Sequence, residues 1–289
     1  MKKIAILGCE NSHANKFLNY VIKESLYPDI EIAGVWSDEP DAVKKLVDEY
    51  GVYAMTSPDE FVGKIDGLVI TARRGSDHYR LAAPYIPTGI PMFIDKPITI
   101  GEEEAVCFMR HLMENNIRIT GGSSLKQDEF ICRLKQEAID KAGGNTIGGY
   151  VRAPYQRVNE YGGFYFYAQH LVEMVCEIFG RFPISVLAKE NGKQIHVLFH
   201  YPDYDCIGLL CDENYNYYAS RMSETASSSY PIPSSNEWFY KEFLEFYELL
   251  CGGDSAVSYD EFISPVFIMN AIARSLESGK EETINPISI

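Results

Sequence analysis

A lysine and its neighbours offer the clearest candidate chemistry in this sequence. Asp95 and Lys96 follow a run of three apolar residues (92–94), and Pro97 comes directly after them. Such an apolar run is typical of a buried parallel strand, and proline cannot donate a ladder hydrogen bond. Asp95 and Lys96 should therefore lie where a central strand emerges, at the edge where open α/β sheets bind their ligands.

Lys96 supports two interpretations. A lysine held at that edge and partly desolvated can have a lowered pKa and can move protons. Alternatively it is a solvated lysine that merely follows a strand, since most lysines are exposed. The elements around it must decide between the two.

A second candidate site follows the first apolar segment of the chain. A dinucleotide pyrophosphate binds the helix N-terminus of a strand–loop–helix unit, usually over G-x-G-x-x-G. Only Gly8 of that fingerprint is present, and Glu10 stands where a small residue normally lets the backbone approach the phosphates. Asn11, Ser12 and His13 could donate hydrogen bonds instead. Alternatively, Asn11 or Ser12 only caps the helix and His13 is exposed.

The second and third apolar segments also end in candidate ligand contacts. Ser37 and Asp38 follow the second segment. An acid there holds the ribose hydroxyls of NAD, whereas a small polar residue with a nearby arginine suits the NADP phosphate. Asp38 favours NAD, although it could instead cap the helix that begins near Pro40. Arg73, one of two adjacent arginines after the third segment, could clamp a phosphate or carboxylate.

The segments that must position these residues alternate between strand and helix over the first half of the chain. Strands are predicted at 3–8, 30–36, 67–71, 92–94 and 117–120, and helices at 14–24, 40–50, 77–85 and 102–115. This alternation implies right-handed crossovers and a parallel, doubly wound sheet.

The second half predicts a different architecture. After a helix at 125–142, successive strands with a tight turn at Asn191-Gly192 indicate an antiparallel sheet. His196 and His200 share one face of a strand, but no third ligand completes a metal site, so we expect none. Residues 214–236 are polar and predict a long surface loop. The predicted strands are 146–154, 184–188, 194–201 and 206–211, and the final helices are 238–250 and 263–276.

Length and charge bound the class of protein. A chain of 289 residues suggests two domains, which we place at 1–122 and 123–289. The net charge of −15 argues against nucleic acid and anionic membranes as partners. The seven cysteines are scattered without zinc spacing, which favours reduced thiols in a cytoplasmic protein. The first apolar run is too short for a signal peptide, and no segment is long enough to span a bilayer.

The order of these features resembles the glucose-fructose oxidoreductase / inositol dehydrogenase / rhizopine-catabolism (Gfo/Idh/MocA) family. The matching stretches cover nearly the whole chain. They are the strand–Gly8–loop–helix, VWSDEPDAVKKLVDEYG, IDGLVIT with His78, AAPYIPTGIPMFIDKPIT, GGFYFYAQHLVEMVCEIFG and the closing helices from EFLEFYELL onward. The block with Asp95-Lys96-Pro97 is similar to the family's Glu-Lys-Pro, with aspartate in place of glutamate.

The resemblance implies an N-terminal Rossmann domain that binds NAD or NADP, and a second α+β domain with an open, mostly antiparallel sheet. It implies that Lys96 contacts the substrate hydroxyl or the nicotinamide, and that His170 is the acid or base. Family members usually carry an aspartate four residues before this histidine, where this chain has Phe166. Glu173, one helical turn after His170, could orient the imidazole. Lys126 is a further polar candidate.

The function implied is hydride transfer between nicotinamide and a hydroxyl-bearing carbon of a small sugar, polyol or related metabolite. Two alternatives stay open: a non-catalytic nucleotide or metabolite binder, and a redox-neutral enzyme with tightly bound NAD. A homo-oligomer through the C-terminal sheet is also expected. The expected cofactor contacts are Gly8, Asn11, Ser12, His13, Ser37, Asp38, Thr71, Arg73, His78 and Asp95.

Overall fold

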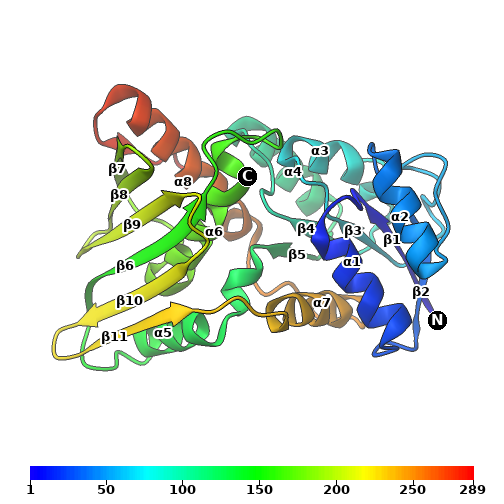
Figure 1. Ribbon diagram of the computed structural model, residues 1–289, viewed down its shortest axis with the longest axis horizontal. Coiled ribbons are helices and arrows are strands. Elements are labelled where there is room, and N and C mark those ends of the chain that lie inside the picture. Colours follow the sequence, from blue (N-terminus) through cyan, green and yellow to red (C-terminus); the bar gives the residue numbers. More distant parts are fainter.

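The computed structural model describes all residues from 1 to 289 and shows two α/β lobes side by side along the long axis (Figure 1). The N-terminal lobe contains a five-stranded parallel sheet with strand order β2-β1-β3-β4-β5. This confirms the predicted doubly wound sheet. Its strands are β1 (Lys2–Leu7), β2 (Ile30–Trp36), β3 (Gly67–Ile70), β4 (Met92–Asp95) and β5 (Ile119–Gly122).

Helices connect these strands as crossovers. Every residue of β3, β4 and β5 is buried, which explains why these strands are continuously apolar or small rather than alternating. The connecting helices are α1 (Ser12–Leu18), extended by a π-helical turn (Asn19–Lys23), α2 (Pro40–Tyr50), α3 (Gly75–Ala82), and α4 (Glu102–Glu114) after a 3-10 turn (Ile86–Thr88).

The C-terminal lobe contains a seven-stranded sheet in the order β11-β10-β6-β9-β8-β7-β12. Only β6 and β9 pair in parallel, so the prediction of a mostly antiparallel sheet is confirmed. Its strands are β6 (Thr146–Tyr155), β7 (Ser185–Asn191), β8 (Gln194–His200), β9 (Asp205–Asp212), β10 (Tyr217–Ser223), β11 (Ser227–Ile232) and β12 (Glu282–Thr283).

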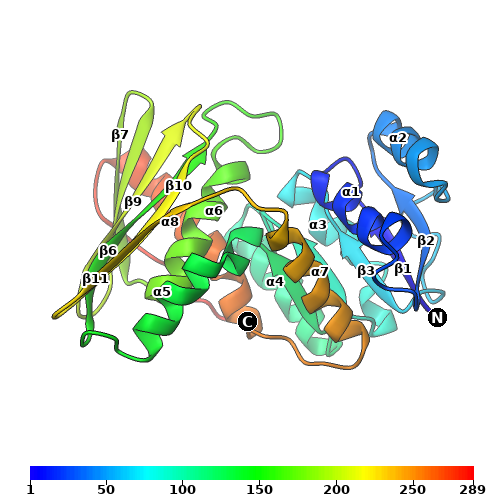
Figure 2. The ribbon, with the colours of Figure 1, turned by 60° about the horizontal axis from the view of Figure 1, so that its bottom comes forward.

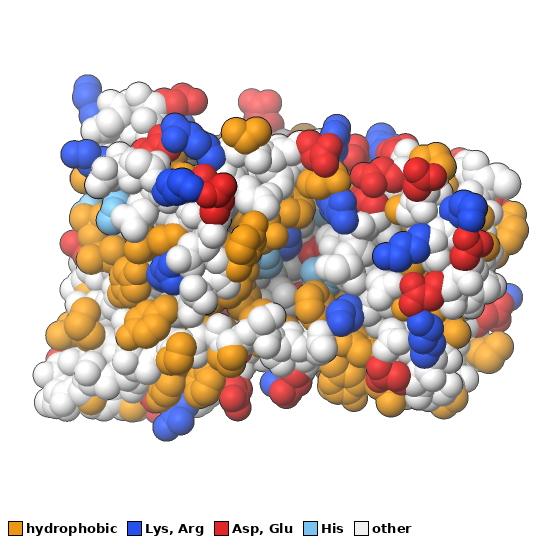
Figure 3. Space-filling model, in the orientation of Figure 1, with side chains coloured by type: hydrophobic (Ala, Val, Ile, Leu, Met, Phe, Trp, Pro, Cys, Tyr) orange, Lys and Arg blue, Asp and Glu red, His pale blue; other side chains and the backbone are white.

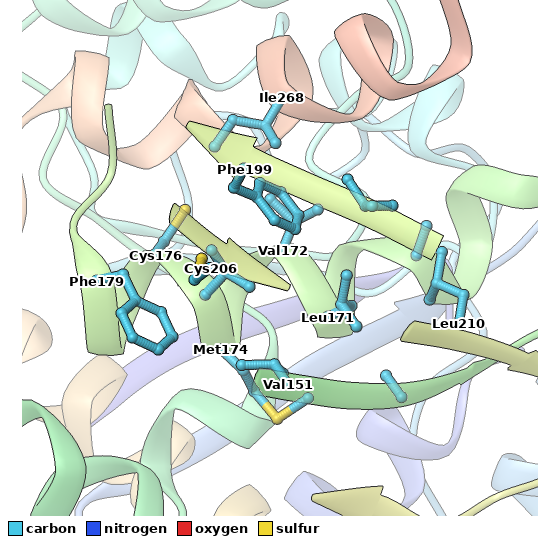
Figure 4. Packing of buried hydrophobic residues seen from close by; sticks show 14 of the residues in the cluster. Val151, Leu171, Val172, Met174, Cys176, Phe179, Phe199, Cys206, Leu210 and Ile268 are labelled. Carbon is cyan, nitrogen blue, oxygen red and sulfur yellow. The ribbon is translucent and has the colours of Figure 1, made fainter. Parts of the chain in front are cut away.

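Helices cover one face of this sheet and leave the other open (Figure 2). The covered face holds the largest hydrophobic core, in which side chains of β6, β8 and β9 interdigitate with α6 and α8 (Figure 4). The helices of this half are a 3-10 helix (Ser124–Gln127), α5 (Glu129–Ile139), α6 (Phe164–Phe179), α7 (Glu237–Leu250) and α8 (Tyr259–Ser278).

Two local predictions were wrong. Residues 214–236, predicted as a surface loop, contain β10 and β11. The edge strand β11 is mostly solvated, so its Ser/Tyr composition does not show the apolar pattern of a strand. The single predicted helix at 125–142 is split, because the Asp128 side chain accepts hydrogen bonds from Phe130 N and Ile131 N and starts a new helix.

Helix α7 returns from the second half of the sequence to the first sheet. It packs against α1 and β5. Phe243 and Phe246 on α7 share an aromatic core with Phe17 and Phe93 of the N-terminal lobe. The start of α8 likewise contributes Phe262 and other apolar residues to the opposite face of that sheet. The first sheet therefore depends on chain beyond residue 122 for its packing.

No helix has both the length and the apolar character needed to cross a lipid bilayer.

Candidate active site

Lys96 of the first lobe contacts α6 of the second lobe through the Phe166 carbonyl. Between the two lobes the molecular surface is hollowed, and histidine side chains are visible there (Figure 3). Lys96 follows the carboxyl end of β4, and His170 lies in the second turn of α6. Lys96 is 5% exposed and His170 8% exposed. The structure therefore brings together the two residues that the sequence predicts as catalytic, and it makes both of them buried rather than solvated.

The Lys96 ammonium has few partners. Its Nζ donates a hydrogen bond to the Phe166 carbonyl at 3.1 Å and lies 4.1 Å from the centre of the Phe166 ring. Burial lowers the pKa of Lys96 below its ordinary 10.5, against the opposing charge of Asp95. A buried cation with one carbonyl and an aromatic face is poised to interact with an additional polar atom, such as a substrate oxygen.

Ser123 is the hydrogen-bond partner of His170. The Ser123 Oγ lies 2.6 Å from His170 Nδ1 and also accepts a hydrogen bond from Leu125 N. A hydroxyl can accept from a protonated Nδ1 or donate to a bare one, so Ser123 can hold the imidazole in either protonation state. Burial, followed by the charge of Lys96, lowers the pKa of His170 well below 6.5. His170 is therefore a neutral base at pH 7.

Glu173 lies one turn further along α6 but has different partners. It accepts a hydrogen bond from Gln169 Nε2 at 3.0 Å, and Arg181 Nη1 lies 3.6 Å from its other oxygen. Gln169 Oε1 in turn accepts from Ile98 N, in the loop after Lys96. The contact with His170 that was expected of Glu173 is made by Ser123, and Glu173 instead supports the loop through Gln169.

Glu10 links the candidate phosphate loop to the ends of the two neighbouring strands. Its carboxylate accepts hydrogen bonds from Ser37 Oγ at 2.6 Å and Arg73 N at 2.8 Å, which ties the ends of three strands together. Gly8 has a φ of +76°, and a Cβ there would lie 2.2 Å from Ala72 N, so only glycine fits. Gly8 is therefore required by the close approach of the chain after β3 to the end of β1.

A cavity of about 350 Å³ opens beside this loop. Asp38 lines it and is paired with Arg80 at 2.7 Å. Ser37 also lines it, although its hydroxyl is engaged by Glu10. Arg73 turns toward the second lobe, where its Nη1 donates to Tyr161 Oη at 2.6 Å. The charged side chains that line the cavity are Glu10, Asp38, Glu39, Arg74 and Asp77.

Four of the predicted cofactor contacts are buried, contact other protein groups and do not line this cavity; they are Thr71, His78, His13 and Asp95. Thr71 donates to the Gly8 carbonyl, and His78 lies between the carbonyl oxygens of Ala72 and Ile98. His13 and Asp95 contact each other, 4% and 0% exposed. Of the neighbouring loop residues, Asn11 donates to Asp95, and Ser12 is exposed.

Lys126, a further polar candidate, contacts the end of β5 and a carboxylate of α7. Its Nζ donates to the Gly121 carbonyl at 2.7 Å and lies 3.5 Å from Glu245 Oε2. Glu245 and the adjacent Glu242 belong to α7, and sequence reasoning did not identify either of them. The only signal was an acid within an aromatic helix face, because Glu242 lies beside Phe239, Phe243 and Phe246 in the sequence.

Residues 2–122 match the sequence model of a family described as "Oxidoreductase family, NAD-binding Rossmann fold". This is the model of the Gfo/Idh/MocA family, and the match covers the N-terminal part of the chain. The predicted recognition is confirmed, and the NAD-binding oxidoreductase expectation is supported by the family description. A comparison with curated proteins gave no match.

Solved structures of similar fold cover the whole chain. A myo-inositol dehydrogenase from Corynebacterium glutamicum is 16% identical, with a TM-score of 0.83 over 99% of this chain and 100% of that one. A scyllo-inositol dehydrogenase from Lactobacillus casei, solved with NAD(H) and scyllo-inositol, is 13% identical, with a TM-score of 0.83 over 98% and 99%. At these identities the likeness shows the fold, including that of the second lobe.

Proposed function

We propose that this protein is an NAD-dependent oxidoreductase that transfers a hydride between nicotinamide and a hydroxyl-bearing carbon of a small metabolite. The observation that carries the proposal is a pair of buried residues, Lys96 after the end of β4 and His170 on α6. Lys96 belongs to the part of the chain that matches the NAD-binding family, and His170 belongs to the second lobe. Bound NAD would supply the hydride acceptor, and the cavity lined by Gly8, Ser37 and Asp38 would hold it.

The protein's residues would handle the proton and the charge. His170, neutral at pH 7, would take the proton of the substrate hydroxyl at the ring nitrogen that does not face Ser123. Ser123 Oγ would accept a hydrogen bond from the Nδ1–H of the resulting imidazolium and so stabilise it. The Lys96 ammonium would stabilise the negative charge that develops on the substrate oxygen. In the reverse direction the same groups would return the proton.

The substrate would be a small sugar, polyol or related hydroxy compound. Structural neighbours include dehydrogenases of myo-inositol and scyllo-inositol. Phe166 replaces the family's usual aspartate, and its ring covers the Lys96 ammonium. The site therefore offers an apolar contact where a carboxylate would hold a hydroxyl, which favours a substrate with fewer hydroxyls on that side.

Calorimetry with NAD+, NADH, NADP+ and NADPH tests the proposal, followed by turnover with a panel of sugars and polyols. We expect NAD+ and NADH to bind and at least one hydroxy compound to yield NADH. Failure of all four nucleotides to bind would contradict the proposal and favour a non-catalytic metabolite binder. Cofactor that co-purifies and never accumulates as NADH during turnover would favour the redox-neutral alternative.

We also propose that the open face of the C-terminal sheet joins copies of this chain. Leu187, Ile207 and Met222 lie on that face and are 38%, 47% and 44% exposed. Exposed apolar patches commonly mark interfaces. We expect light scattering to give an oligomer for the native protein and a monomer for Ile207→Glu. The control Ile139→Glu, at an exposed position on α5, should leave the oligomer intact; a native monomer would refute the idea.

The expected cytoplasmic location stays a proposal. It is supported by the seven cysteines, all of which are free and three of which are exposed, as suits a reducing compartment.

A further inference from the structure

A buried row of ionisable groups lies behind Lys96 and takes no part in the reaction described above. His13 of α1 stands between Asp95 of β4 and Glu242 of α7. Its Nδ1 lies 3.1 Å from Asp95 Oδ2, and its Nε2 lies 3.1 Å from Glu242 Oε2. All three side chains are at most 5% exposed. One imidazole thus bridges two carboxyl groups from distant parts of the chain.

Aromatic rings pack around His13 in this row. The centres of the Phe239, Phe17 and Phe93 rings lie 4.8, 5.9 and 6.3 Å from that of His13. Charges are costly in such surroundings. Burial accordingly lowers the pKa of His13 below 6.5 and raises the pKa of Glu242 well above 4.5. Burial therefore favours a protonated Glu242 and a His13 that carries a single ring proton.

The contacts of the two ring nitrogens link the place of that proton to the state of Glu242. A protonated Glu242 donates from Oε2 to His13 Nε2, which leaves Nδ1 as the N–H that faces Asp95. The Nδ1 contact lies off the hydrogen-bond axis, so it acts as an electrostatic attraction to the carboxylate. Asp95 has two aligned donors as well: Asn11 Nδ2 at 2.8 Å and Lys96 N at 2.6 Å.

Asp95 matters because it supports the charge of Lys96. Burial raises the pKa of Asp95 to about 6, while His13 and Lys96 act to lower it. Asp95 is in turn the strongest influence that opposes the loss of the Lys96 proton on burial. Conditions that keep Asp95 ionised therefore favour the protonated form of Lys96.

We propose that His13 is a positioning residue for the hydride transfer: held by Glu242 with its proton on Nδ1, it keeps Asp95 ionised and thereby keeps the Lys96 ammonium charged inside a buried site. The inference rests on the proposed role of Lys96. The other charged or titratable groups near the row are Lys126, Glu245 and Glu173, which influence Glu242, and Arg73 and His170 on the Lys96 side.

Nuclear magnetic resonance on the full chain tests the proposal without any substrate. Long-range proton–nitrogen spectra of protein labelled with ¹⁵N-histidine report the tautomer of each of the six histidines, and His13→Gln assigns the His13 signals. Carbon-labelled lysine, assigned with Lys96→Arg, reports the titration midpoint of Lys96. The matched control is His111→Gln on α4, whose ring faces Tyr79.

We expect His13 to be neutral with its proton on Nδ1 and not to titrate between about pH 6 and about pH 8. His13→Gln should lower the Lys96 midpoint by about one pH unit, because Asp95 then protonates more readily. His111→Gln should leave that midpoint unchanged. Glu242→Gln should also preserve the His13 tautomer, since its amide can donate to Nε2 as the protonated acid does.

A proton on Nε2 of the native His13, an ordinary titration near pH 6.5, or an unchanged Lys96 midpoint in His13→Gln would each overturn the proposal. If His13→Gln does not fold, the His13 signals are assigned by through-bond correlation to the backbone, and the native and Glu242→Gln spectra still decide, because a tautomer that flips in Glu242→Gln contradicts a neutral Glu242. Failure of the proposed function, seen as no NAD binding, would leave these spectra unchanged, so the two failures are distinguishable.

Discussion

Replacing Lys96 by methionine is expected to lower kcat by about 10³-fold, while the Kd for NAD changes by no more than about threefold. In the proposed mechanism the ammonium stabilises the charge on the substrate oxygen, and methionine removes the ammonium at similar volume. Its burial without a salt bridge costs stability, so the variant should melt at the same temperature as the native protein or higher. Turnover with the best substrate, calorimetry and thermal unfolding measure the three effects.

Lys96→Arg is the matched control, because arginine keeps the charge but does not deprotonate in the accessible range. In the proposed mechanism, oxidation of the hydroxyl requires neutral His170 and charged Lys96. Native activity should therefore be lost at acid pH with a midpoint well below pH 6.5, and at alkaline pH with a midpoint below pH 10.5. The arginine variant should lose the alkaline fall and keep the acid one. A Lys96→Met enzyme within tenfold of native kcat would refute the assignment.

NAD is expected to bind about 100-fold more tightly than NADP, a difference of about 2.7 kcal/mol. The cavity beside the Gly8 loop is lined by four carboxylates and one arginine, and a 2′-phosphate would add further negative charge to it. In Asp38→Ser one of these carboxylates is removed and Arg80 is released from its pair. The Kd for NADP should then fall by about tenfold in calorimetry, while NAD binding weakens or stays unchanged.

Asp48→Asn provides the control for net charge. Asp48 is exposed on α2 and paired with Lys44, and it does not line the cavity. This variant changes the overall charge by the same amount as Asp38→Ser but should leave both affinities within about twofold. Native protein that binds NADP as tightly as NAD would show that the acidic lining does not face the ribose.

The order of strands and the placement of Lys96 could be predicted because they depend on local signals. An apolar run that ends at proline shows where a strand emerges, and parallel strands present such ends at one edge of the sheet. His170 needed the family resemblance, since nothing in an apolar helix shows which face meets a strand from the other lobe. Ser123 could have been found by the same strand-end rule, because it directly follows β5.

His13 shows how a local signal can mislead. Its place in the phosphate loop suggested a cofactor contact, but His13 and Phe17 lie four residues apart on the same buried face of α1. Glu242 was missed for the opposite reason. It lies on an apolar face of α7, and only the three-dimensional packing of α7 against α1 reveals its partner. Polar groups inside an aromatic core are specified by contacts between distant segments, which one sequence does not display.

The return of α7 and the start of α8 to the first sheet constrains how this protein folds as it is made. Phe243, Phe246 and Phe262 complete the apolar layers on the two faces of that sheet. During synthesis the first 122 residues therefore leave the ribosome before α7 and α8 are made. Both apolar layers remain incomplete until more than a hundred further residues have been added. A chain stopped after residue 122 would keep its strands and helices α1 to α4 but would expose the apolar surface that α7 and α8 bury. We therefore expect the cofactor half to be unstable when it is produced alone.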